Sequence, residues 1–498
     1  MKTTQNRNRL RIAITVSFSM ILGELASDLA FSQDNTTPTN NASLVMKNPP
    51  NQPRYTPATR DAMKQYLEDL KQRTPRIPLP QQSEDEKKLE LEDPRTYGYE
   101  GRLRRIYLMD TTTGSYSGFS GSSGARSSAT SLPPDPALTL DYAFKVRLFW
   151  IAARANNCQY CLGHQESKLL AAGMSEDAIA ALDSDWGAFD VKEQVAFALA
   201  KRLTNEPHLL TSADIDACKE HFSDLQILEM IGSIAGNNAI NRWKEGTGVP
   251  QSTNGGNFGR SKPADSNSSE EHSYLTPTSK KFVERVSTVA VLDTENLSLR
   301  TNSPTACNRP PLEMGEELAK RLAQVDARKP RLPLASDAVT RDVLGTSLKG
   351  SQPMQWHRLL ANFPVAGKRF VDGIEFTRSH DELSIPLQAM LDWVVARQDR
   401  AWYAIRLADE DIEKANVSKS TVQALDGDLR QSSAHLAERD RLLLIVAKNL
   451  AASPIVLTDA QVDDAIRVAG PRAVTQVINY TTFRAAFDRI TEAAGLGN

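Results

Sequence analysis

The chain has 498 residues, of which 40% are hydrophobic and 24% are charged. At about 100 to 200 residues per domain, this length excludes a single small module, and the composition excludes wholesale disorder. The 59 basic and 61 acidic residues nearly cancel and form no basic block, so we expect no nucleic-acid partner. Four cysteines are too few for a disulfide scaffold.

The start of the chain, 1–32, is typical of a signal peptide. A basic segment that includes Lys2 and Arg11 leads into the apolar stretch 12–25, and small residues suited to cleavage end at Ser32. The apolar stretch is shorter than the ~20 residues that a spanning helix needs. We therefore expect a protein exported to the periplasm or the cell exterior, with no stable membrane span.

Composition predicts where domains begin and end. Residues 33–60 are rich in Asn, Thr and Pro and predict a flexible leader, and residues 251–310 predict a low-complexity linker. Elsewhere apolar residues recur every three to four positions, with little alternation of period two. This pattern predicts an all-α protein whose helical domains are joined by irregular linkers.

An internal repeat divides the remaining chain into two domains. The sequence PRIPL at 75–79 returns as PRLPL at 330–334, and further matches follow in order, first at an offset of 243 and then at an offset of 247. We therefore expect two homologous helical domains in tandem, residues 61–250 and 311–498.

The candidate chemistry lies in the first domain, after an apolar helix expected over 138–157. If a new helix starts at Cys158, then Cys158, Cys161 and His164 fall on one face, one turn apart. A helix N-terminus and a neighbouring histidine both lower the pKa of a thiol, so this spacing favours a reactive thiolate. Since two thiols and a base can cycle through a disulfide, these three are the candidate catalytic residues.

The same motif permits other kinds of site. Covalent haem attachment would need a histidine directly after the second cysteine, where this chain has Leu162. A thioredoxin-type site would need strands around the motif, and the pattern here is helical, so we expect neither site. A zinc site would need a fourth ligand, and Cys218 lies far along the chain. A static disulfide suits an oxidising compartment, although a bridge closing two residues adds little loop entropy. Zinc and a static disulfide stay open as alternatives to the leading hypothesis, which needs no cofactor and no metal.

A resemblance to a known family rests on the run ARANNCQYCLGH at 153–164, the apolar helix before it and the closing residues 241–242 and 248–250. These features resemble the carboxymuconolactone decarboxylase and alkylhydroperoxidase D-like superfamily. The resemblance covers residues 138–250 and, more weakly, 353–498. It implies an all-helical fold in which the second cysteine of the motif, Cys161, attacks a peroxide, Cys158 resolves the product and His164 carries the proton.

One position of the family's proton relay differs here. The redox branch usually has a glutamate twelve residues before the first cysteine, and Val146 occupies that position in this chain. Glu166 and Glu193 are the candidates to replace it.

The second domain lacks this chemistry. At the offset of 243, Ala401, Ala404 and Leu407 stand in place of the two cysteines and the histidine. We expect residues 311–498 to be a degenerate, non-catalytic copy. Either this copy pairs with the first domain within one chain, or the protein forms a homo-oligomer. Three aromatic residues of this copy are predicted to lie in the core rather than in a ligand pocket: Trp393, Trp402 and Tyr403.

The remaining cysteines and histidines give weaker patterns. Cys218 and Cys307 could form a bridge, since export permits one. No partner pattern surrounds His208, His221 or His272, and we expect them at the surface.

The leading function is an exported dithiol oxidoreductase that reduces hydroperoxides or a partner disulfide through Cys158 and Cys161, with electrons from a thiol donor. The intact motif favours this enzyme. Val146 favours its rival, a non-enzymatic helical binding or assembly protein with a structural disulfide. A decarboxylase-type enzyme acting on a small lactone rests on the family resemblance alone.

Overall fold

The computed structural model describes residues 49–57, 59–109, 119, 135–251, 273–285, 311–432 and 434–497. These residues form helices and connecting loops, with no strand among them, so the predicted all-α class is confirmed. All of them belong to one compact unit, 46–498. The expected signal peptide, Cys307 and His272 lie outside the described residues.

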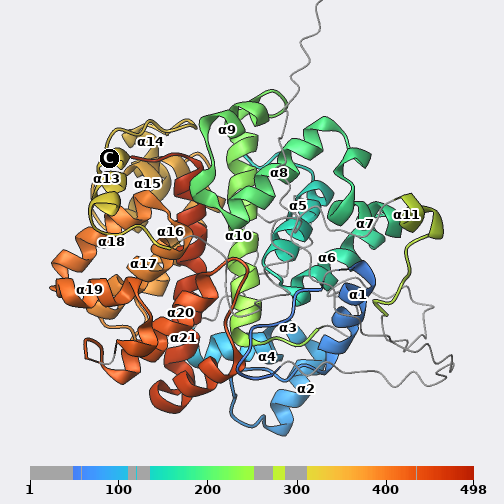
Figure 1. Ribbon diagram of the computed structural model, residues 1–498, viewed down its shortest axis with the longest axis horizontal. Coiled ribbons are helices and arrows are strands. Elements are labelled where there is room, and N and C mark those ends of the chain that lie inside the picture. Colours follow the sequence, from blue (N-terminus) through green and yellow to red (C-terminus); the bar gives the residue numbers. More distant parts are fainter. Residues whose placement is uncertain are drawn as a thin grey trace, which may run out of the picture. The chain divides into compact units, whose positions relative to one another are not determined.

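The first half of the chain contains the helices that hold the candidate site (Figure 1). They are α1 (Arg60–Asp69), α2 (Glu84–Glu92), α3 (Pro94–Tyr97), α4 (Tyr99–Leu103), α5 (Tyr142–Ala155), α6 (Gln159–Ala171), α7 (Glu176–Ser184), α8 (Val191–Asn205), α9 (Ser212–Lys219), α10 (Asp224–Thr247) and α11 (Lys280–Arg285). Asp141 caps α5 by accepting a hydrogen bond from the Phe144 N–H at 2.9 Å, so this helix begins later than the predicted residue 138.

The second half contributes a further set of helices. They are α13 (Gly315–Val325), α14 (Asp337–Leu344), α15 (Gln355–Leu360), α16 (Ala366–Arg378), α17 (Ile385–Asp399), α18 (Trp402–Lys414), α19 (Lys419–Asp426), α20 (Glu438–Ala451) and α21 (Asp459–Ala493). Gly470, with a φ of 84°, and Pro471 interrupt α21, because neither residue continues a regular helix there. Buried along most of its length, α10 packs against α5, α8 and α21 (Figure 1).

The helices of the two halves correspond in order and position. The first residues of α5, α6 and α7 match those of α17, α18 and α19 at the offset of 243. The first residues of α8 and α20 match at the offset of 247. These are the two offsets at which the sequence repeats. The spacing of the helices therefore repeats together with the sequence.

Buried contacts recur in the two halves at matching positions. Arg73 Nη2 lies 3.2 Å from Glu245 Oε2, and the Arg76 N–H donates to the Thr247 carbonyl at 3.0 Å. The second half repeats both contacts with Arg328 and Glu492 (2.9 Å) and with Arg331 and Ala494 (2.8 Å). The recurrence extends the match from helix positions to one ion pair and one backbone hydrogen bond.

Two arginines join the halves by reciprocal hydrogen bonds. Arg242 Nη2 on α10 donates to the Ala451 carbonyl at 2.7 Å, and Arg489 Nη2 on α21 donates to the Thr204 carbonyl at 3.0 Å. The offset of 247 relates the two arginines to each other, and it relates the two carbonyls as well. Both guanidinium groups also donate to Ser453 Oγ. Reciprocal contacts between matching residues are characteristic of a two-fold, isologous interface.

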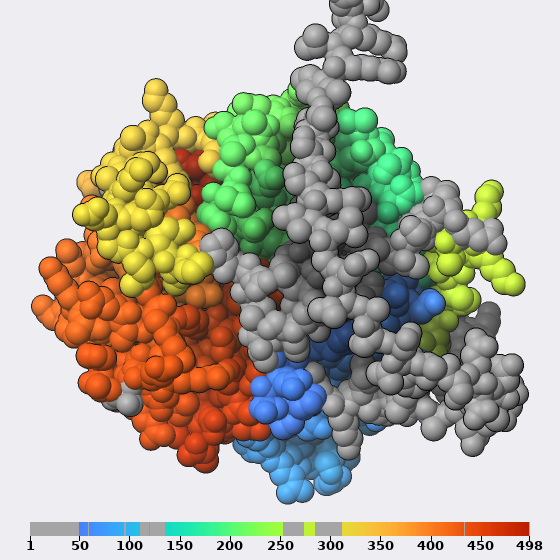
Figure 2. All heavy atoms as spheres, in the orientation of Figure 1, coloured from blue at the N-terminus to red at the C-terminus, as the bar shows by residue number. Residues whose placement is uncertain are grey.

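Loops of the two halves also meet near α9. Arg331 Nη2 donates to the Leu210 carbonyl at 2.9 Å, and Lys219 Nζ donates to the Arg331 carbonyl at 3.1 Å. Figure 2 shows the α9 region, in green, beside the yellow surface of the residues that follow 311.

Parts of the expected leader and linker are packed. Pro53, Thr56 and Pro57 are buried, and Arg54 Nε lies 3.4 Å from Glu245 Oε2. The flexible leader that composition predicts does not extend to this stretch, because its side chains pack against the first half. Residues 273–285 of the expected linker likewise include α11 and a buried tyrosine, Tyr274.

Candidate functional site

The break between α5 and α6 places both thiols at the start of a helix. Asn157 adopts the left-handed conformation, with a φ of 58°, which asparagine tolerates better than most residues. Cys158 is then the N-cap of α6, and Cys161 lies in its first turn. The two Sγ atoms are 2.7 Å apart, and the exposed fractions of Cys158 and Cys161 are 0% and 1%. The structure therefore brings the predicted cysteines within reach of a disulfide bond.

His164 lies one turn further along α6 and is partly buried. Its Nδ1 lies 3.2 Å from the Tyr160 carbonyl, so Nδ1 donates and the lone pair of the neutral ring is on Nε2. The two rings stack with centroids 4.3 Å apart. Burial, followed by repulsion from Lys244 and Lys168, lowers the pKa of His164 to about 3. His164 is therefore neutral at pH 7 and a weak base, so it does not lower the pKa of a thiol as the predicted charged neighbour would.

This shift predicts a pH dependence of stability. In the unfolded chain the pKa of a histidine is about 6.5, so below that pH the unfolded state binds a proton that folded His164 does not. The free energy of unfolding should then fall by about 2 kcal/mol more between pH 7 and pH 5 in the wild type than in His164→Gln. Urea unfolding at both pH values measures the difference, and comparing the two proteins cancels the other histidines. Parallel pH profiles would show that His164 titrates normally in the folded chain.

A charged cluster that no sequence pattern indicated lies against Tyr160. Lys244 Nζ of α10 lies 4.1 Å from the centroid of the Tyr160 ring and forms an ion pair with Glu100 of α4. Trp243 Nε1 donates to Glu100 Oε1 at 2.7 Å. Burial alone would lower the pKa of Lys244, but the Glu100 carboxylate raises it, so the side chain stays cationic. Burial raises the pKa of Tyr160 to about 12.

Glu245, the next residue of α10, was also missed. It is buried between Arg54 and Arg73, whose nearest nitrogens are 3.4 and 3.2 Å from Oε2. Burial raises the pKa of Cys158 well above its ordinary value, the contact with Cys161 raises it further, and the charge of Glu245 adds to the shift. Cys158 is therefore a protonated thiol. The match of Glu245 with Glu492 at the offset of 247 was available in the sequence to indicate this position.

The two candidate relay carboxylates form ion pairs with other residues. Glu166 is buried, with Arg60 and Lys64 nitrogens 2.8 and 2.9 Å from Oε2, and Trp150 Nε1 donates to Oε1 at 2.6 Å. Burial opposes its ionisation, but the two cations outweigh that effect and lower the pKa of Glu166 to about 2. Glu193 pairs with Arg147 at 2.6 Å. These contacts give both glutamates a structural role in joining helices.

The end of the first domain packs on α6 beside the motif. Gln251 Nε2 donates to the Gln159 carbonyl at 3.0 Å. A Cβ at Gly163 would lie 2.1 Å from that same nitrogen and 3.0 Å from the Tyr274 ring. A larger residue at this position would therefore displace the Gln251 amide from α6 and press against the Tyr274 ring.

The positions that replace the motif in the second half are filled by apolar side chains. Ala401 is the N-cap of α18, and both Ala401 and Ala404 are buried. Trp393, Trp402 and Tyr403 are buried as well, which confirms the prediction that they belong to the core.

The other predicted residues lie apart from the dithiol chemistry. Cys218 carries a buried thiol, and burial raises its pKa to about 11. His221 is exposed and His208 is partly buried. Among the described residues, no group of three or more His, Cys, Asp and Glu side chains could hold a metal ion.

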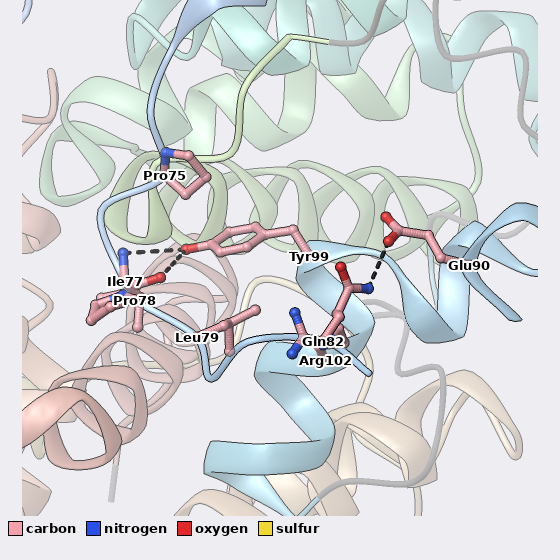
Figure 3. A pocket seen from close by; sticks show the side chains of 8 residues that line it. All are labelled: Pro75, Ile77, Pro78, Leu79, Gln82, Glu90, Tyr99 and Arg102. Carbon is pink, nitrogen blue, oxygen red and sulfur yellow. Dashed lines mark hydrogen bonds between the residues drawn. The ribbon is translucent and has the colours of Figure 1, made fainter. Parts of the chain in front are cut away.

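A pocket of about 360 Å³ lies between the 75–82 segment and α2 to α4 (Figure 3). Two of its polar side chains are paired with neighbours: Gln82 Nε2 donates to Glu90 Oε2 at 2.7 Å, and the Tyr99 hydroxyl accepts from the Ile77 N–H at 3.2 Å. Because neither a thiol nor a histidine lines it, the candidate chemistry belongs to the dithiol and not to this pocket.

Comparison with known proteins finds neither a family model nor a curated protein that matches this chain. Within the described part of the chain, every helix is too short or too polar to cross a membrane.

Proposed function

We propose that the protein is an exported dithiol oxidoreductase of the alkylhydroperoxidase D-like kind, which reduces hydroperoxides or a partner's disulfide. The observation that carries this proposal is the approach of Cys158 Sγ and Cys161 Sγ to 2.7 Å at the start of α6. Sulfurs so placed exchange two electrons by forming and breaking one S–S bond. His164 lies one turn further along the same helix, but its lowered pKa makes the ring a weak base, so the proposal depends on the two sulfurs and not on proton uptake by His164.

With a hydroperoxide the proposed reaction has two steps. The Cys161 thiolate attacks one peroxide oxygen, the O–O bond breaks, and the products are a Cys161 sulfenic acid and an alcohol. Cys158 Sγ then attacks Cys161 Sγ, forming the disulfide and releasing the hydroxyl group as water. The two thiol protons end on the alcohol and the water, and the two thiols are oxidised as the peroxide is reduced. An external thiol donor restores the dithiol by exchange.

We also infer that residues 61–250 and 311–498 are two copies of one domain, of which only the first retains chemistry. The repeated helix spacing and the reciprocal contacts of Arg242 and Arg489 support this inference. The second copy would then occupy the place that a partner subunit takes in a two-fold dimer.

The burial of both thiols favours a second candidate function. Cys158 and Cys161 expose 0% and 1% of their surface, as the cysteines of a permanent disulfide would. In this alternative the protein is a helical binding or assembly module, and the cysteine pair only stabilises the fold.

Turnover and reduction potential together test the proposal. With dithiothreitol as the donor, the full chain should consume cumene hydroperoxide or reduce insulin disulfides over many turnovers. The reduction potential of the cysteine pair should lie above about −300 mV, the limit below which structural disulfides fall. Protein alkylated after reduction is the control. A potential below that limit, with no turnover of either substrate, would establish the structural disulfide instead.

A further inference from the structure

The pocket of Figure 3 contains a buried arginine without a counter-ion. Arg102 of α4 lines this pocket and exposes only 6% of its surface. Its Nη2 donates to the Pro80 carbonyl at 2.5 Å. Among the described residues, Nε of Arg102 has no hydrogen-bond partner, and no carboxylate forms an ion pair with the guanidinium group. Burying a charge is costly unless the charge is paired, so this group is suited to bind an anion from outside the chain.

The second half contains the same arrangement with a counter-ion supplied by the chain. In both halves an arginine donates to the carbonyl of the residue that follows the repeated PRIPL or PRLPL motif. In the second half this donor is Arg358 Nε, which lies 2.9 Å from the Ala335 carbonyl, and Arg358 also pairs with Asp337 at 3.4 Å. Two residues after the carbonyl, where the second half has Asp337, the first half has Gln82. The first half thus has the arginine, but a neutral amide replaces its carboxylate partner.

Much of the rest of the pocket is apolar, and hydrogen bonds hold its wall in place. One segment of the chain contributes four apolar lining residues: Pro75, Ile77, Pro78 and Leu79. The Tyr99 hydroxyl donates to the Ile77 carbonyl at 3.0 Å, and the Tyr107 hydroxyl donates to the Pro78 carbonyl at 2.7 Å. A wall that is already fixed loses little conformational entropy when a ligand binds. The volume of about 360 Å³ is in the range of small-molecule sites.

One acidic residue, Glu90, also lines the pocket. It is partly exposed, and its Oε2 accepts from Gln82 Nε2 at 2.7 Å. In Figure 3 the guanidinium group of Arg102 lies on the other side of Gln82 from Glu90. Water and salt screen a partly exposed charge more than a buried one. The buried arginine therefore has the larger influence on which ligand the pocket prefers.

We propose that this pocket binds a small carboxylate with an apolar body, whose carboxyl group pairs with Arg102 as Asp337 pairs with Arg358. The planar guanidinium group matches the geometry of a carboxylate, and its hydrogen bonds to a charged acceptor are among the stronger ones. The apolar body of the ligand would contact the prolines and Leu79. This site is separate from the dithiol, so the proposal does not depend on the proposed function.

Calorimetric titration of the full chain with benzoate tests the proposal. Benzamide has a similar shape but no charge, so it should bind at least about tenfold more weakly than benzoate. Gln82→Asp gives the first half the carboxylate that the second half has, so it should weaken benzoate binding about tenfold or more. Gln82→Asn is the matched control, because it changes the side chain in the same way without adding the charge. Its affinity for benzoate should stay within about threefold of the wild type.

Two further measurements keep the test decisive. Glu90→Gln removes a repulsive charge at a partly exposed position, so it should strengthen benzoate binding. Inorganic phosphate should bind more weakly than benzoate, because it has no apolar body. Tighter binding of phosphate than of benzoate would assign the site to oxyanions in general and overturn the proposal. The proposal is also wrong if the wild type does not bind benzoate at millimolar concentration, or if Gln82→Asp and Gln82→Asn bind it equally well.

Discussion

Replacing Cys161 by serine is expected to abolish hydroperoxide consumption, while replacing Cys158 by serine should permit a single turnover. The attacking sulfur cannot be dispensed with, because it forms the bond to oxygen. The second sulfur is needed only to remove that oxygen as water and regenerate the site. Cys158→Ser should therefore accumulate a sulfenic acid on Cys161, which dimedone labelling and mass spectrometry detect. The expected loss in multi-turnover rate is at least about a thousandfold for either variant.

The chain provides a matched control for these substitutions. Cys218 is a buried thiol outside the motif, so Cys218→Ser should retain the wild-type turnover rate. A sulfenic acid trapped on Cys158 in the Cys161→Ser variant would reverse the two roles. Equal multi-turnover rates in the wild type and both motif variants would exclude the dithiol mechanism.

The largest effect on stability is expected from Arg489→Met. Arg489 is fully buried, and its Nη2 lies 3.0 Å from Oδ1 of Asp399, which is fully buried as well. Asp488 lies close enough for its charge to interact with both residues, and burial raises the pKa of its carboxyl group well above the usual range. Without the guanidinium group the Asp399 carboxylate would be buried without the counter-ion that pairs with both of its oxygens. Loss of one partner of such a pair costs about 3–5 kcal/mol of the free energy of unfolding.

Arg242→Met is the control for that variant. Arg242 occupies the matching position in the first half, but it donates to neutral groups: Asn238, the Ala451 carbonyl and Ser453. Its removal should cost about 1–3 kcal/mol, the usual penalty for leaving buried neutral groups unpaired. Urea unfolding followed by circular dichroism measures both values. Equal costs for the two substitutions would mean that the buried carboxylates are not the cause.

The sequence by itself determined the fold class and the place of the dithiol. Apolar spacing predicts helices because the helical period is a local property of the backbone. The sequence predicted that one helix ends at residue 157 and that a new one starts at Cys158, and Cys158 is the N-cap of α6. A C-x-x-C pair at the start of a helix needs no distant residue to bring its sulfurs together, so its geometry could be predicted from spacing alone.

The charges around the dithiol were decided only by the tertiary structure. Glu166 looked available for a proton relay, but α1 brings Arg60 and Lys64 to it and makes it a structural anchor. Lys244 comes to the Tyr160 ring on α6 from a distant part of the sequence, because α10 packs against α6. A hydrophobic pattern indicates which face of a helix is buried, but it does not show which helix will cover that face. The partners of a buried charge depend on that packing, so they could be identified only once the helices were assembled.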